Sequence, residues 1–226
     1  MAIMMKYIEY AINQNGLEKK LGLLGESHLY LPSESKFARK IVKNFDTVAY
    51  EGSDKKMISL SVISALAVPG LLAYAAATGR WPKNCAIDIA KKYGMKIVRI
   101  EDNVDDSFTY KEKMTLALAY IISALKSPFT YRYYKLCGNP DVPGTRAYKA
   151  KKSDERKGFG YSALVRNLAE RDENMAKNIV EVLEKYKGNI LVVCGELHLE
   201  GVIKNLTGVL DMKEVRTASP KYKTNP

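Results

Sequence analysis

Two similar stretches, LGLLGESHL at residues 21–29 and ILVVCGELHL at residues 190–199, decide how this chain is expected to fold. Each begins with a short apolar run typical of a buried strand and ends with the pentapeptide G-E-x-H-L. The two pentapeptides contain both histidines of the 226 residues. Because α/β proteins build their sites where strands end, the repeat predicts one shared site at two strand ends.

Predicted strands and helices alternate on either side of these stretches. Apolar runs of strand length lie at 20–24, 47–50, 95–100, 190–194 and, as an edge strand, 213–217. Helical patterns lie at 33–44, 161–187 and, as a short opening helix, 1–15. This alternation predicts an α/β fold with a mostly parallel central sheet, built from two similar halves and flanked by helices.

The length fits a single domain, residues 1–226, with a helical insertion at roughly 57–160 that an α/β unit at 84–101 interrupts. Residues 57–79 carry no charge, and 114–125 form a second apolar run that Pro128 is expected to end. The two runs could be buried helices that pack on each other, a homodimer face, or a membrane contact.

The net charge limits the kinds of partner to be expected, and the cysteine content indicates the redox state of the thiols. The net charge of +11 favours anionic surfaces or substrates, but no basic stripe interleaved with aromatic residues follows one element, which disfavours nucleic acid. Three widely spaced cysteines without a C-x-x-C motif indicate reduced thiols. Without the apolar segment of a signal peptide at its start, the chain is expected to be cytoplasmic, with membrane association left open.

Polar residues at the predicted strand ends are the candidates for the site. If the strands are parallel, five of them meet at the carboxyl edge of the sheet: Glu26, His28, Glu51, Glu196 and His198. On the predicted helix at 161–187, Asp172 falls inside the apolar stripe and Arg171 on its edge. Because charges on a buried face are costly unless paired or functional, both are candidates for binding substrate.

Three kinds of function remain open for these residues. In the first, His28, His198 and Glu51 hold a divalent metal ion such as Mn²⁺, Co²⁺ or Zn²⁺, and the remaining groups hydrolyse a peptide or small-molecule substrate. The catalytic candidates are then Glu26, Glu51, Arg171 and Glu196. In the second, Glu and His do the acid–base chemistry without metal, and in the third the cleft only binds a ligand. No G-x-G-x-x-G or P-loop pattern indicates a nucleotide cofactor.

Four pieces of the chain resemble the TraB/PrgY/Tiki superfamily, which is related to the erythromycin esterase-like and ChaN-like proteins. They are Gly25-x-x-His28, Glu51, RDENMA at 171–176 and VVCGELHLEG at 192–201. Glu26 stands where Thr is common, and Glu196 where a small residue is common. The resemblance implies an α/β core of two similar halves and a metal-dependent peptidase of the Tiki type. It also implies a link to pheromone shutdown in the TraB and PrgY branches and haem binding in the ChaN branch.

Overall fold

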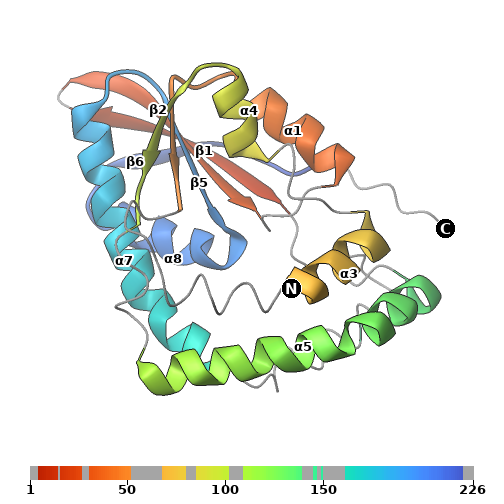
Figure 1. Ribbon diagram of the computed structural model, residues 1–226. Helices are drawn as coiled ribbons and strands as arrows, with labels where there is room; N and C mark the ends of the chain where they lie inside the picture. Colours follow the sequence, from red (N-terminus) through yellow and green to blue (C-terminus); the bar gives the residue numbers. More distant parts are fainter. Residues whose placement is uncertain are drawn as a thin grey trace.

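The computed structural model describes residues 5–14, 16–26, 31–51, 68–79, 85–101, 109–138, 145–146, 149 and 161–220. They form an α/β fold with a six-stranded mixed sheet (Figure 1). The strands are β1 (Lys6–Gln14), β2 (Leu17–Glu26), β3 (Thr47–Tyr50), β4 (Lys96–Arg99), β5 (Ile190–Gly195) and β6 (Met212–Ala218). The described helices are α1 (Pro32–Val42), α3 (Val68–Thr78), α4 (Ala86–Lys92), α5 (Tyr110–Cys137), α7 (Tyr161–Lys185) and α8 (Glu196–Thr207).

The sheet has the strand order β4-β3-β5-β2-β1-β6. The first four strands in this order are mutually parallel, whereas β1 is antiparallel to both of its neighbours, β2 and β6. The α/β class is therefore confirmed, but the expected mostly parallel sheet holds only for the four strands from β4 to β2. The edge strand predicted at 213–217 is confirmed as β6.

The opening helix predicted at 1–15 is wrong, because residues 6–14 of this segment form strand β1. Side chains on both faces of β1 are buried, with Tyr7 in one core and Ile8 in the other, which suits a strand inside a sheet better than a helix with one apolar face. Gln14 pairs with Leu17, and the Asn15-Gly16 dipeptide between them is typical of a two-residue hairpin turn. Gly16 has a φ of 77°, which favours glycine.

Helices cover both faces of the sheet and enclose two apolar cores. On one face, α7 and α8 pack on alternate residues of the central strand β5, namely Ile190, Val192 and Cys194. On the other face, α1 and α4 pack on Leu191 and Val193. A strand buried on both faces is uniformly apolar, which explains the run ILVVC. This three-layer arrangement fixes where side chains beyond the strand ends point.

Helices α3 and α5 lie in the stretch 57–160, where an insertion is predicted, and pack against each other at the side of the α/β body (Figure 1). Helix α4 and strand β4 lie in the stretch 84–101, for which an α/β unit is predicted. The prediction that Pro128 ends the second apolar helix is wrong, since α5 continues through it to Cys137. A proline removes one hydrogen bond of the helix, and the long runs on either side preserve the rest. Within the described residues, no helix combines the length and apolarity needed to cross a bilayer.

Candidate functional site

Each of the four parallel strands leads into a glutamate at its carboxyl end. Glu101 follows β4 by two residues, Glu51 directly follows β3, Glu196 directly follows β5, and Glu26 is the last residue of β2. Since the four strands are neighbours in the sheet, these glutamates follow one another along a single edge. The chain thus concentrates negative charge at the edge where α/β proteins bind ligands.

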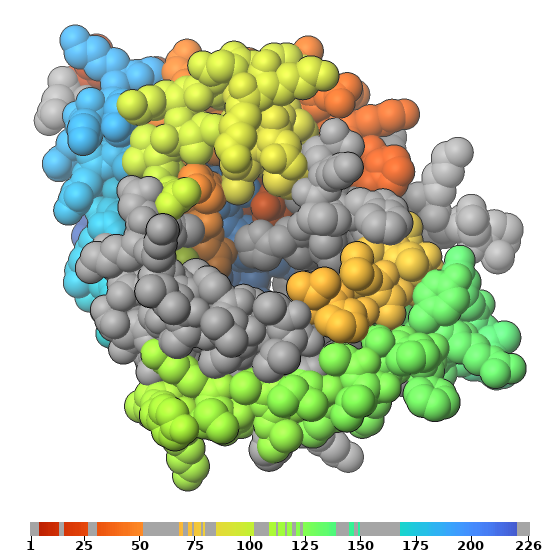
Figure 2. Space-filling view, viewed as in Figure 1, coloured from red at the N-terminus to blue at the C-terminus, as the bar shows by residue number. Residues whose placement is uncertain are grey.

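The neighbouring strands β3 and β5 mark the point where the chain changes direction across the sheet. From β3 the chain continues outward to α4 and β4, whereas from β5 it continues through α8 on the opposite face towards β6. In open α/β sheets such a switch point leaves a crevice outside the strand ends. Figure 2 shows a hollow in the surface here, with orange atoms of the β3 region and blue atoms of the β5–α8 region in its floor.

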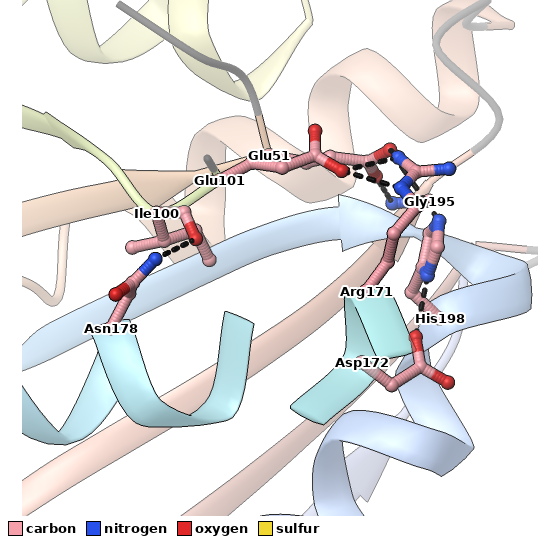
Figure 3. Close-up of polar contacts among 8 residues, drawn as sticks. All are labelled: Glu51, Ile100, Glu101, Arg171, Asp172, Asn178, Gly195 and His198. Atoms are coloured by element: carbon pink, nitrogen blue, oxygen red, sulfur yellow. Dashed lines mark hydrogen bonds and ion pairs between the residues drawn. The ribbon is translucent and has the colours of Figure 1, made fainter. Parts of the chain in front are cut away.

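Arg171 joins two of these glutamates (Figure 3). Its Nε donates to Glu101 Oε1 over 2.6 Å, and one of its terminal nitrogens donates to Glu51 Oε1 over 2.9 Å. The side chains are largely buried, with exposed fractions of 16% for Arg171, 14% for Glu51 and 7% for Glu101. A guanidinium group suits this position because its planar fork of donors can bridge two carboxylates.

The carboxylate of Glu51 is also held by the start of α8. The Gly195 N–H donates to Glu51 Oε2 over 2.6 Å, and the positive end of the helix dipole favours a negative charge there. Glu51 extends β3 alongside β5, because its own N–H donates to the Val193 carbonyl. Its side chain points to the α7–α8 face because Ala49, two residues earlier, packs on that face.

His198 lies in the first turn of α8 and is held by Asp172 of α7. The distance between His198 Nδ1 and Asp172 Oδ1 is 2.5 Å, and both residues are buried. The other ring nitrogen, Nε2, lies 3.6 Å from Glu51 Oε1. With the proton on Nδ1 donated to Asp172, Nε2 faces the carboxylates as an acceptor. Asp172, His198, Glu51 and Arg171 therefore form one connected cluster on a single face of the sheet (Figure 3).

Gly201 makes room for the Asp172 side chain. A Cβ atom on Gly201 would lie 1.8 Å from Asp172 Oδ2 and 2.6 Å from its Cγ. The carboxylate therefore rests directly on the backbone of α8, one turn after His198. The contact between Asp172 and His198 therefore requires glycine at position 201, because a side chain there would occupy the space that the Asp172 carboxylate fills.

Burial changes the protonation behaviour of two groups at this edge. It raises the pKa of Glu101 above its usual value; the positive charge of Arg171 opposes this increase, and the negative charge of Glu51 adds to it. Burial, reinforced by the charges of Glu51, Glu26 and Asp172, also raises the pKa of the Cys194 thiol. Cys194 therefore stays protonated near neutral pH, which makes it a poor nucleophile.

Three residues that the sequence predicted for the site remain to be placed: Glu26, Glu196 and His28. Glu26 pairs with Gly195 in the sheet register, but it shares the α1–α4 face with Leu24, opposite Glu51. Its charge acts there on the Cys85 thiol, whose pKa burial raises to about 11. Glu196 begins α8. His28 lies outside the described residues.

Glu101 was missed as a member of the site, although its sequence position was informative. It follows an apolar strand in the same way as Glu51 does, which is the signal that could have placed it at this edge. Only the structure shows that Arg171 reaches both carboxylates from α7. The inward position predicted for Asp172 agrees with its 6% exposure.

The donors at this edge fit a divalent cation only in part. His198 and Glu51 provide one imidazole and one carboxylate, but Arg171 and the Gly195 N–H already occupy both oxygens of Glu51. Within the described residues, no group of three or more His, Cys, Asp or Glu side chains is arranged to hold a metal ion. The second predicted ligand, His28, is not among those residues.

Comparison of the chain with protein-family models, with curated proteins and with solved structures finds no match.

Proposed function

We propose that the protein is a hydrolase in which His198 acts as the general acid and base. The observation that carries this proposal is the pair formed by His198 Nδ1 and Asp172 Oδ1 at 2.5 Å. A buried carboxylate on one ring nitrogen selects the tautomer and leaves the other nitrogen to exchange protons with a substrate or a water molecule. Nε2 faces the strand-end carboxylates at the switch point, where ligands of α/β proteins bind.

The roles of the remaining residues follow from their contacts. Asp172 positions His198 and stabilises the imidazolium that forms when Nε2 takes a proton from water. The cluster of Glu51, Arg171 and Glu101 provides a fixed arrangement of charges beside the reacting atoms, and the guanidinium is the group suited to stabilise a developing oxyanion. This chemistry fits hydrolysis of an ester or an amide. The family resemblance favours a peptide among such substrates.

A metal-dependent hydrolase is the second candidate. In many metal sites a histidine presents one nitrogen to the ion while a carboxylate holds the other, as Asp172 holds His198. The strand-end glutamates give the edge the excess of negative charge that attracts a divalent cation. A bound ion would supply an activated water molecule at neutral pH. Glu51 would then have to exchange one of its present partners for the ion.

A hydrolysis assay with and without chelator separates these two candidates. Purified protein is incubated with a panel of peptides and esters, before and after removal of divalent ions and after their return. The proposal predicts turnover that resists the chelator, whereas turnover that requires Mn²⁺, Co²⁺ or Zn²⁺ supports the second candidate. If no member of the panel is hydrolysed under either condition, the cleft is better explained as a site that binds a ligand without converting it.

A further inference from the structure

The longest helix, α5, carries an exposed apolar stripe along its whole length. Eight large apolar residues of the helix that are at least one-third exposed belong to it: Tyr110, Met114, Leu118, Ile121, Ile122, Leu125, Phe129 and Leu136. At roughly 100° per residue they fall within an arc of about 120°. A helix of 28 residues is about 40 Å long. Scattered exposed apolar residues are ordinary, but a continuous stripe of this length indicates an interaction surface.

Basic residues lie within and beside this stripe. Lys111 lies near the start of α5, and Lys126, Arg132 and Lys135 lie in its second half; all four are exposed. Glu112 is the only acidic residue in the helix sequence, and the segment from Met114 to Leu125 between the basic groups has no charge. Lysine and arginine at such positions extend their charged ends to a polar boundary while their aliphatic stems cover apolar surface.

This charge distribution argues against a second copy of the chain as the partner. In an antiparallel pair of α5 helices, Lys111 of one copy would approach Arg132 and Lys135 of the other. In a parallel pair, each basic residue would approach its own equivalent. Both arrangements bring like charges together, which disfavours association. An anionic surface complements these residues instead, in agreement with the chain's net charge of +11.

We propose that the apolar stripe of α5 and its flanking basic residues dock the protein on an anionic membrane surface. The helix lies in the plane of the interface, with Leu118, Leu125 and Phe129 inserted among the lipid acyl chains. Lys126 and Lys135 lie just outside the arc of the stripe, one on either side, and face the headgroups, where each basic residue strengthens binding about fivefold. Exposed tyrosines at 110, 131 and 133 suit the same boundary, since their rings are apolar and their hydroxyls polar. This docking is independent of the reaction at the strand ends.

Co-sedimentation with lipid vesicles tests the proposal. The full chain is mixed with vesicles of phosphatidylcholine alone and with vesicles that contain about 30% phosphatidylserine, at about 0.1 M salt. We expect binding to the phosphatidylserine vesicles and little binding to phosphatidylcholine alone. Lys126→Gln with Lys135→Gln is expected to weaken binding on the order of 25-fold, because two charges are lost. The matched control, Lys91→Gln with Lys92→Gln on α4, removes the same charge elsewhere and is expected to bind like the parent.

A second variant tests the apolar part of the surface. Leu125→Ser with Phe129→Ser is expected to reduce vesicle binding at least about tenfold, whereas Val209→Ser with Val215→Ser, also at exposed sites, is expected to leave it unchanged. Circular dichroism confirms that each variant is folded. Failure of the parent to bind phosphatidylserine vesicles overturns the proposal. Equal vesicle binding by the α5 and α4 charge variants also overturns it. A third contrary result is a stable dimer of the parent that Leu125→Ser with Phe129→Ser abolishes, while the vesicles do not bind the parent.

Discussion

Replacing Gly201 by alanine is predicted to separate Asp172 from His198. The new Cβ would lie 1.8 Å from Asp172 Oδ2, whereas a carbon and an oxygen in contact need about 3.3 Å. The carboxylate must therefore move by about 1.5 Å or rotate away. Because the distance between Asp172 Oδ1 and His198 Nδ1 is now 2.5 Å, a retreat of this size brings it to about 4 Å, beyond hydrogen-bonding range.

The expected loss in stability is modest because two effects oppose each other. Losing a hydrogen bond to a charged group costs about 1.5–3 kcal/mol, and replacing glycine by alanine inside a helix returns about 1 kcal/mol. We therefore expect Gly201→Ala to lower the free energy of unfolding by about 0.5–2 kcal/mol. In a chain that already carries Asp172→Ala, the clashing carboxylate is gone and only the Cβ of residue 172 remains close, at 3.1 Å, so Gly201→Ala should be close to neutral.

Two measurements check this prediction. Denaturant unfolding of the parent, both single variants and the double variant gives the interaction energy between the two positions. Nitrogen NMR of the imidazoles reports the His198 tautomer directly, and His28→Asn assigns the two signals. Gly208→Ala is the matched control, because its Cβ would meet nothing closer than 3.4 Å. Equal costs of Gly201→Ala in the presence and absence of Asp172, or an unchanged His198 tautomer, would refute the reasoning.

Three further predictions concern the charges at the strand ends. Arg171→Met should lower the free energy of unfolding by about 3 kcal/mol, since Glu51 and Glu101 lose their common cation; addition of Glu101→Gln should recover part of this loss, and a full additive loss would contradict the shared pairing. Glu101 has a raised pKa in the folded protein, so above its ordinary value of 4.5 the unfolded chain binds fewer protons and stability falls as pH rises. The free energy of unfolding of Glu101→Gln minus that of the parent, measured from unfolding curves, should therefore increase with pH above 4.5. A constant or decreasing difference would contradict the raised pKa of Glu101. Cys194, which is fully buried with a raised pKa, should react with thiol reagents only after denaturation, as mass spectrometry of labelled peptides can show; rapid labelling of the native protein would be inconsistent with this burial.

Much of the site could be predicted because strand ends are marked in the sequence. A uniformly apolar run followed by glycine or a carboxylate places Glu51 and Glu196 at one edge once the strands are taken as parallel. Helical periodicity places Asp172 on the buried face of its helix. These arguments need only local patterns and one assumption about the direction of the strands. The cluster of carboxylates at the β3 and β5 ends follows from them.

Other features depend on contacts that local patterns do not contain. Glu26 and His198 lie on opposite faces of the sheet. The face that a strand-end side chain occupies is set by the strand register and by the packing of α7 and α8. The role of Gly201 depends on the approach of a side chain from another helix. The hairpin at β1, by contrast, was marked by Asn15-Gly16, and its prediction as a helix gave too much weight to apolar spacing and too little to the turn.

The most direct test of the proposed chemistry is the hydrolysis rate of His198→Gln in buffer freed of divalent ions, measured on the substrate that the parent converts fastest. Glutamine retains a polar side chain of similar reach but cannot take up a proton at neutral pH. The account predicts that the rate falls by about 10²–10⁴-fold, while Glu26→Gln, on the opposite face of the sheet, loses much less. A His198→Gln variant that keeps the parent's rate would contradict the role assigned to this histidine.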